Sequence, residues 1–257
     1  MEKWKGRVAV VTGANSHFGS AICEKLLNIG MVVIGTHKSG PRYLERVTKK
    51  LEGKGIFLPM KCDITKNEIK NFFFTIRKKF GGVDVCINND GYIPVGLNVM
   101  DGSITDWRKM FEVNVIGASL FMQLTVKSIR ERKLDEGHII NISCLAGRCI
   151  YDVGVIHFYT AAKLALNTLS KGLRQTLREA KSGIKVSVGV FDKEINPWII
   201  QTDSFTPIPT NINRYDPPNL LREAEPAFRP EDVAHTVTQI LATPSHDEVS
   251  SSSSNKL

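Results

Sequence analysis

The chain has 257 residues, of which 42% are hydrophobic and 23% are charged, a composition typical of a globular protein. No apolar run approaches the roughly 18 residues of a membrane span, and Met1–Arg7 is too short and too charged for a signal peptide. The net charge of +8 is scattered along the chain without a basic, aromatic-lined patch, which argues against a nucleic-acid partner. The five cysteines lack CxxC spacing, so we expect reduced thiols, a cytoplasmic protein and no metal site.

Short apolar runs alternate along the chain with longer amphipathic stretches, which predicts strands and helices in turn. Because the strands are apolar almost throughout, they fit a parallel sheet covered by helices on both faces. We therefore predict one doubly wound, Rossmann-type α/β domain over residues 1–244, with six parallel strands. The predicted strands are Val8–Val11, Met31–Ile34, Ile56–Met60, Val83–Ile87, His138–Ile142 and Ile184–Val190. The predicted helices are Ser20–Ile29, Pro41–Leu51, Lys66–Phe80, Thr105–Arg132, His157–Ala180 and Pro230–Ala242.

Two segments fall outside this alternation. Residues 191–229 are rich in proline, asparagine, threonine and aspartate. We interpret them as a long loop that forms much of the substrate pocket, because irregular loops of this length in compact domains usually carry function. Residues 245–257 are rich in serine and predict a disordered tail.

A glycine-rich turn, TGANSHFGSA at residues 12–21, follows the first predicted strand directly. Free N–H groups and the helix dipole make such a turn at the start of a helix an anion site. An ordinary strand-to-helix turn remains the alternative interpretation. The candidate residues for binding the phosphates of a dinucleotide are Gly13, Asn15, Ser16, His17, Phe18 and Gly19.

Polar turns also follow the next three predicted strands, where a ligand of a doubly wound sheet would lie. Lys38 stands near the position at which an NAD site usually has an acidic residue, so it predicts a site for the 2′-phosphate of NADP(H). A plain loop lysine is the alternative. Asp63 follows the third strand, beside Ile64, within reach of an adenine amino group, and Asn88 ends the fourth. Together these turns predict a nicotinamide cofactor site.

Tyr159 and Lys163 are spaced i, i+4, which places them on one face of a predicted helix. A neighbouring ammonium group favours the phenolate and lowers the pKa of a tyrosine. Such a tyrosine can pass a proton to or from a substrate oxygen. In isolation, a Tyr–Lys pair of this kind is usually structural.

The segments TGANSHFG, CDIT, NNDG, FEVNVIG, INISCLAG and YTAAK, in this order and spacing, resemble the short-chain dehydrogenase/reductase family. The resemblance extends from Lys5 to about Pro244, and within the family the chain is similar to the dehydrogenase/reductase member 11 and farnesol dehydrogenase-like branch. It implies an NADP(H)-dependent oxidoreductase acting on alcohol and carbonyl groups of a small lipophilic substrate of isoprenoid, steroid or retinoid type.

The resemblance also implies catalytic roles for individual residues. Tyr159 would be the acid/base and Lys163 its electrostatic partner, and both would contact the cofactor. Asn114 would anchor a proton-relay water. Cys144 occupies the position of the family's catalytic serine, where a thiol is a weaker hydrogen-bond donor than a hydroxyl.

The chain departs from the family pattern at several points around the expected cofactor. His17 replaces the middle glycine of the turn, Asp90 replaces an alanine, and Phe191–Asp192 replaces a Pro-Gly pair. The family's seventh strand is replaced by the serine-rich tail. One hypothesis is therefore an oxidoreductase of low activity. The alternatives are an inactive relative that binds a ligand or a partner, and an enzyme with altered chemistry at Cys144. The oligomeric state stays open, with a homodimer as the candidate.

Overall fold

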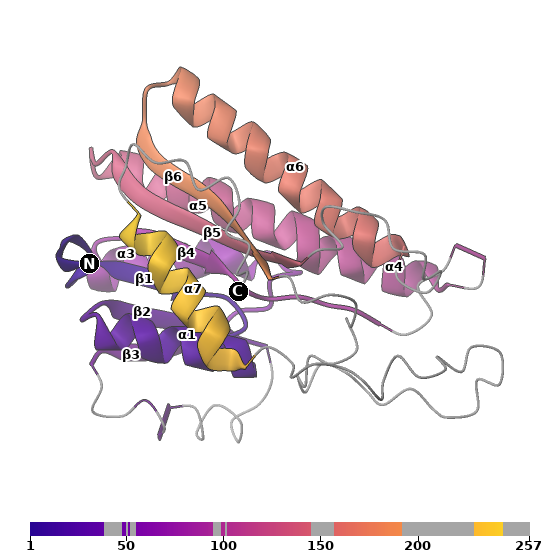
Figure 1. Cartoon of the computed structure of the whole chain (residues 1–257), viewed down its shortest axis with the longest axis horizontal. Helices are drawn as coiled ribbons and strands as arrows, with labels where there is room; N and C mark the ends of the chain where they lie inside the picture. Colours follow the sequence, from indigo (N-terminus) through magenta and orange to yellow (C-terminus); the bar gives the residue numbers. More distant parts are fainter. Residues whose placement is uncertain are drawn as a thin grey trace, which may run out of the picture.

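The computed structural model describes residues 1–38, 48–49, 51, 55–94, 99–100, 102–144, 157–191 and 229–243. Within these ranges, parallel strands form one six-stranded sheet in the order β3-β2-β1-β4-β5-β6 (Figure 1). The predicted parallel sheet of a doubly wound α/β fold is confirmed. The strands are β1 Val8–Val11, β2 Val32–His37, β3 Phe57–Lys61, β4 Val85–Asn88, β5 Glu136–Cys144 and β6 Gly183–Phe191.

The described helices follow the predicted ones, with boundaries shifted by up to three residues and with one interruption. The stretch predicted as a single helix over Thr105–Arg132 is interrupted by a π-helical turn, Glu112–Gly117. The predicted helix over Pro41–Leu51 and the expected loop and tail lie largely outside the described residues. The helices are α1 His17–Asn28, α3 Glu68–Phe80, α4 Ile104–Phe111, α5 Ala118–Glu131, α6 His157–Glu179 and α7 Pro230–Ala242.

The strands alternate their side chains between two apolar layers, as the period of a strand requires. Val8 and Val10 of β1 point into a core shared with α3, α5 and α6. Ala9 and Val11 point into a second core shared with α1 and α7, which lie side by side over the other face of the sheet (Figure 1). Both faces of the sheet are therefore covered, which explains why its strands are apolar throughout.

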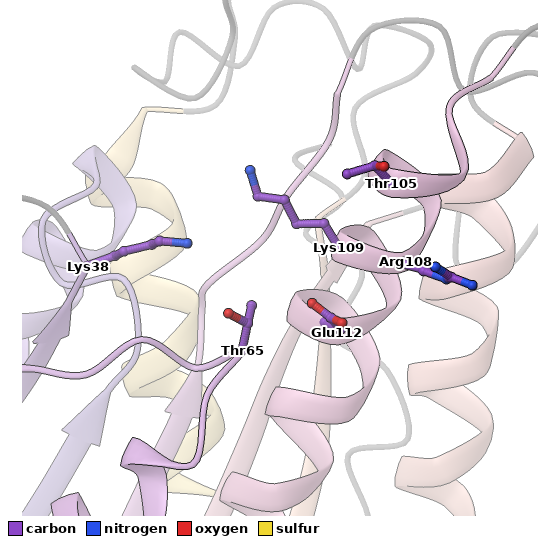
Figure 2. A pocket seen from close by; sticks show the side chains of 6 residues that line it. All are labelled: Lys38, Thr65, Thr105, Arg108, Lys109 and Glu112. Atoms are coloured by element: carbon purple, nitrogen blue, oxygen red, sulfur yellow. The ribbon is translucent and has the colours of Figure 1, made fainter.

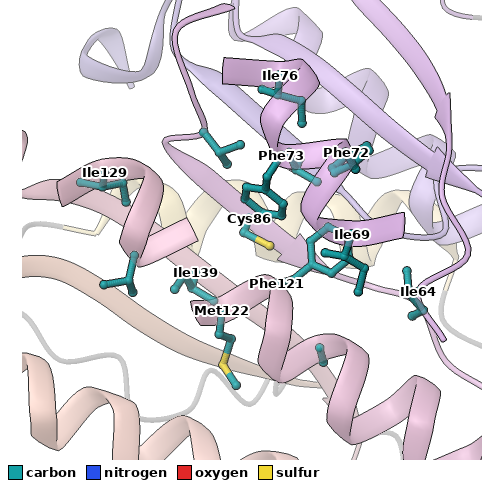
Figure 3. Packing of buried hydrophobic residues seen from close by; sticks show 14 of the residues in the cluster. Ile64, Ile69, Phe72, Phe73, Ile76, Cys86, Phe121, Met122, Ile129 and Ile139 are labelled. Carbon is teal, nitrogen blue, oxygen red and sulfur yellow. The ribbon is translucent and has the colours of Figure 1, made fainter. Parts of the chain in front are cut away.

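Aromatic rings fill the first of these cores beside β4. Phe72 and Phe73 of α3 and Phe121 of α5 lie with ring centroids 5.4 to 5.8 Å apart (Figure 3). Their tilted, edge-to-face arrangement is the favoured geometry for aromatic pairs. This packing fixes α5, and hence the π-helical turn that precedes it, against the sheet.

Charged and polar contacts secure the amino-terminal edge of the sheet. Asp84, which is only 2% exposed, accepts a hydrogen bond from the Val8 amide and pairs with Arg7 and Arg132 at 3.1 and 2.9 Å. The carboxyl ends of the strands form the opposite edge. β1 and β4 are neighbours there although β2 and β3 lie between them in sequence. A ligand of a doubly wound sheet binds at such a switch point.

Candidate active site

The glycine-rich turn connects β1 to α1 in the manner of an anion site. Gly13 adopts a left-handed conformation, with φ of 63°. The Ser16 hydroxyl caps α1 by accepting a hydrogen bond from the Gly19 amide at 3.0 Å, so the helix begins at His17 and not at the predicted Ser20. A Cβ at Gly19 would lie 2.1 Å from the carbonyl oxygen of Gly13. Only glycine lets the helix approach the turn this closely.

The start of α1 leaves backbone donors free. Within the described residues, the amide N–H groups of Asn15, His17 and Phe18 donate to no partner. The side chain of His17 is exposed on the first turn of the helix. Free N–H groups at a helix N-terminus attract phosphate through the helix dipole. This turn therefore supplies the donor set that a dinucleotide diphosphate requires.

The turn after β4 is fastened to the glycine turn. The Thr12 hydroxyl accepts hydrogen bonds from the amides of Asn89 and Asp90, at 3.0 and 2.9 Å. The side-chain amide of Asn89 donates to the Thr12 and Gly13 carbonyls. Asn88, the residue that the sequence suggested for the cofactor, instead points into the fold and donates to the Asn141 side chain at 2.7 Å.

Lys38 and Asp63 meet at the ends of β2 and β3. The Lys38 amino nitrogen lies 3.2 Å from a carboxylate oxygen of Asp63. Thr65 donates to the same carboxylate through its amide and its hydroxyl. Burial raises the pKa of Asp63, but these hydrogen bonds and Lys38 outweigh that effect and leave the pKa below its ordinary value. Ile64 is buried beside this group, 8% exposed. The two residues expected at the adenosine end thus lie together.

A pocket of about 330 Å³ opens next to this ion pair. Lys38 and Lys109 reach toward it from opposite sides, whereas Arg108 points away from Lys38 (Figure 2). Three cations against one carboxylate make the lining positive. The lining side chains are Lys38, Thr65, Thr105, Arg108, Lys109 and Glu112.

The reacting groups expected from the sequence lie at the carboxyl end of β5. The Cys144 thiol is 3.7 Å from the hydroxyl oxygen of Tyr159 on α6. One turn along α6, the amino group of Lys163 donates to the Ile142 carbonyl at 3.1 Å and lies 5.5 Å from the Tyr159 ring centroid. The i, i+4 spacing therefore does place both side chains on one face, against the strand that carries Cys144.

The electrostatics of this group differ from the expectation of a lowered tyrosine pKa. Burial raises the pKa of Tyr159 well above its ordinary value, and the neighbouring Cys144 raises it further. Burial lowers the pKa of Lys163, while Cys144 acts in the opposite direction. The chain's own residues thus keep the phenol protonated, which suits a proton donor.

Asn114 lies in the π-helical turn and is 1% exposed. Its side chain accepts a hydrogen bond from the Tyr92 amide and donates one to the Tyr92 carbonyl, each at 2.8 Å. The side chain thus clamps the segment after β4 to the helix. Single π-helical turns within α-helices are frequent at functional sites.

Apolar side chains surround Tyr159. The rings of Trp107 on α4 and Phe158 on α6 are stacked, with centroids 4.1 Å apart. Ile93 and Ala165 pack in the same small cluster. Tyr159 therefore packs within a mainly apolar cluster.

Sequence reasoning missed two contributors to this edge of the sheet. The first is Asn89, whose side chain holds the glycine turn, whereas the sequence suggested the adjacent Asn88. The second is the polar face of α4 that lines the pocket, although a signal for it exists. Thr105, Arg108, Lys109 and Glu112 have the i, i+3, i+4, i+7 spacing of one helix face.

Comparison with known proteins is consistent with this geometry. The short chain dehydrogenase family model matches residues 7–212. The chain is 34% identical over 254 residues to dehydrogenase/reductase SDR family member 11 of Homo sapiens, covering 97% of this chain and 94% of that protein. It is 32% identical over 261 residues to farnesol dehydrogenase of Aedes aegypti, covering 97% and 95%. A solved structure of a metagenomic short-chain oxidoreductase in complex with NADP aligns with a TM-score of 0.76 at 25% identity, covering 97% of this chain and 96% of that one.

Proposed function

Because this chain belongs to the short-chain dehydrogenase family, we propose that it is an NADP(H)-dependent oxidoreductase that interconverts alcohol and carbonyl groups of a small lipophilic substrate. One observation carries the proposal. Tyr159 and Lys163 lie on one face of α6, and the Tyr159 hydroxyl is 3.7 Å from Cys144 at the carboxyl end of β5. An acid, a cation and a second donor thus converge on one point.

The chain's residues supply the proton chemistry of such a reaction. The cofactor, when bound, would supply or accept hydride. Tyr159 would hold the proton that moves to or from the substrate oxygen, and its raised pKa keeps the phenol protonated, as an acid in carbonyl reduction must be at the start of the step. The Cys144 thiol would donate a second, weaker hydrogen bond to the same oxygen. Lys163 would place a positive charge beneath the phenol ring.

The adenosine end supports NADP(H). Lys38 is exposed and offers a cation at the end of β2, with Lys109 across the pocket. Cations at this position suit a 2′-phosphate. The similar metagenomic structure was solved with NADP. The ion pair with Asp63 competes for the same amino group. To bind a 2′-phosphate, the Lys38 side chain must turn partly away from Asp63.

The apolar cluster around Tyr159 supports a lipophilic substrate. The stacked rings of Trp107 and Phe158 and the side chain of Ile93 offer hydrocarbon contact without charge. One relative at 32% identity is a farnesol dehydrogenase, which is named for an isoprenoid alcohol. We therefore place isoprenoid alcohols and aldehydes first among substrates to be tried, followed by steroids and retinoids.

A second candidate function is an inactive relative that binds a nucleotide or a partner without catalysis. Cys144 favours it, since replacing one oxyanion donor typically costs about 10²–10³-fold in rate.

A homodimer and a cytoplasmic location also remain proposals. Among the described helices, none is long and apolar enough to cross a bilayer. In the same residues, no three His, Cys, Asp or Glu side chains gather as metal ligands.

Dinucleotide binding tests the proposal. Calorimetric titration of the native protein with NADP⁺ and NAD⁺ should give tighter binding of NADP⁺. Lys38→Ala should weaken NADP⁺ binding about tenfold, the loss of one charge-assisted hydrogen bond, with little change for NAD⁺. Lys66→Ala is the matched control, because Lys66 lies 3.9 Å from the same Asp63 carboxylate outside the pocket lining. If the protein binds neither dinucleotide at millimolar concentration, the proposal that it is an oxidoreductase is wrong. Binding without turnover of any carbonyl substrate would favour the inactive relative.

A further inference from the structure

The carboxylate of Asp90 lies directly on the glycine turn. A Cβ built on Gly13 would be 2.7 Å from the Oδ1 atom of Asp90 and 3.1 Å from its Cγ atom. The position is fixed by the backbone, because the Asp90 amide donates to the Thr12 hydroxyl. Asp90 is the residue that replaces an alanine in the resembling family, so this carboxylate is a particular feature of the chain.

No cation in the described residues pairs with the Asp90 carboxylate. Within the described part of the chain, it forms no ion pair and its oxygens accept no hydrogen bond. Lys38, whose charge acts on Asp90, is paired with Asp63. Burial, and then the charge of Asp63, raise the pKa of Asp90 to about 6, while Lys38 lowers it by a smaller amount. The carboxyl group therefore titrates near neutral pH.

The same turn carries the free N–H groups that suit a phosphate, those of Asn15, His17 and Phe18. A phosphate at this turn and an ionised Asp90 would be like charges within a few ångströms and would repel each other. A protonated carboxyl group would instead be a hydrogen-bond donor to a phosphate or ribose oxygen. The ionised carboxylate would therefore repel the ligand, whereas the protonated carboxyl group would bind it.

We propose that Asp90 is part of the dinucleotide site and that its carboxyl group takes up one proton when the ligand binds. The inference rests on the proposed function, since it concerns the same nucleotide. The protonated carboxyl group donates to the ligand beside the glycine turn, so the affinity for dinucleotide falls as the pH rises through the titration of Asp90. Asparagine at this position would keep a donor and remove the charge.

Other groups near the turn also carry charge and must be separated from Asp90. Asp63 and Lys38 face Asp90 from the ends of β3 and β2 as an ion pair, and the lowered pKa of Asp63 keeps its carboxylate ionised. The Cys62 thiol, with its pKa raised by burial to about 12, stays neutral. The side chain of His17 is exposed at the start of α1, and the 2′-phosphate of NADP⁺ is ionisable in this range. Both are present in native and variant titrations alike, so a ratio of the two dissociation constants isolates Asp90.

The test is calorimetric titration of the native protein, Asp90→Asn and Asp90→Ala with NADP⁺ and with NAD⁺ at pH 5.0, 6.0 and 7.5. At pH 7.5, about 1.5 units above the pKa, Asp90→Asn should bind about thirtyfold more tightly than the native protein. At pH 5.0 the two should agree within about twofold. Asp90→Ala should gain less than Asp90→Asn because it offers no donor. Thermal unfolding of each variant verifies that it is folded.

The outcomes separate this inference from the proposed function. If the native protein and Asp90→Asn bind with a ratio that does not change with pH, the inference is wrong while the nucleotide site stands. If Asp90→Asn binds more weakly than the native protein at pH 7.5, the ionised carboxylate itself is a ligand contact and the inference is equally wrong. If no form binds either dinucleotide at any pH, the proposed function fails and the inference fails with it.

Discussion

The thiol of Cys144 and the hydroxyl of Tyr159 are 3.7 Å apart, one at the end of β5 and the other on α6. This is a long contact for a donor to a hydroxyl oxygen, as expected for sulfur. Under the proposed function, the phenol would be the acid and the thiol a weak second donor to the substrate oxygen. On the proposed function, this pair is an acid beside a donor that has been replaced by a thiol.

Restoring a hydroxyl at this position should raise the rate. We expect Cys144→Ser to increase kcat for carbonyl reduction about 10- to 100-fold, because a hydroxyl donates better than a thiol to the developing oxyanion. The measurement is NADPH consumption with an isoprenoid aldehyde. The matched control is Ser143→Ala. Ser143 points to the other side of the strand, and its buried hydroxyl has no partner in the described structure. An equal gain in kcat for Cys144→Ser and Ser143→Ala would show that the gain does not come from a hydroxyl donating to the substrate oxygen.

The contact between α1 and the glycine turn should make Gly19 sensitive to a single methyl group. A Cβ there would meet the Gly13 carbonyl oxygen at 2.1 Å. Gly19→Ala should therefore lower the free energy of unfolding by about 3 kcal/mol, at the upper end for overpacking. Gly172→Ala on α6 is the control, since a Cβ there has no neighbour within 4 Å. It should stabilise the protein by about 0.5–1 kcal/mol. Denaturant unfolding measures both, and a stable Gly19→Ala would contradict the close approach.

Asp90 also predicts a pH dependence of stability. Its pKa is about 6 in the folded protein and 3.8 as an ordinary carboxyl group, so the folded state binds more protons between these values. Stability is therefore lost as the pH rises through about 6. Asp90→Asn should raise the Tm by roughly 2–5 °C at pH 7.5 and change it little at pH 4.

Asp84→Asn provides the contrast to that variant. Asp84 is buried and pairs with Arg7 and Arg132, so the same chemical change should lower the Tm at pH 7.5. Calorimetric scans of both variants at the two pH values decide the matter. A lowered Tm for Asp90→Asn at pH 7.5 would mean that the ionised Asp90 carboxylate has a stabilising partner.

Much of the fold could be predicted from the sequence because its signals are local. Apolar runs and amphipathic periods gave every described strand, and the parallel pattern put their carboxyl ends at one edge. The boundaries were less accurate. Strand β4 starts at Val85 and not at Val83, because the Val83 amide donates to the Ser128 hydroxyl across the sheet face. Such a long-range contact has no local signature.

In the candidate site, too, the features with a local signal could be predicted, and those set by long-range contacts could not. Tyr159 and Lys163 needed only helical spacing to be placed together. The pairing of Lys38 with Asp63 depends on the register of β2 and β3, in which His37 lies beside Lys61. The π-helical turn around Asn114 leaves the apolar pattern continuous, so no period reveals it. The different directions of the Asn88 and Asn89 side chains have no signal in the sequence either, because adjacent residues at a strand end point to opposite sides.

The central claim is that Tyr159 acts as the acid of a reductase. Its most direct test is the initial rate of NADPH oxidation with an isoprenoid aldehyde, compared between the native protein and Tyr159→Phe. We expect the phenyl variant to lose about 10²–10⁴-fold in kcat, while its dissociation constant for NADP⁺ stays within about twofold of native because the proposed phosphate contacts at the glycine turn and Lys38 are unchanged. Equal rates in the two proteins, with NADP⁺ bound equally well, would contradict the account.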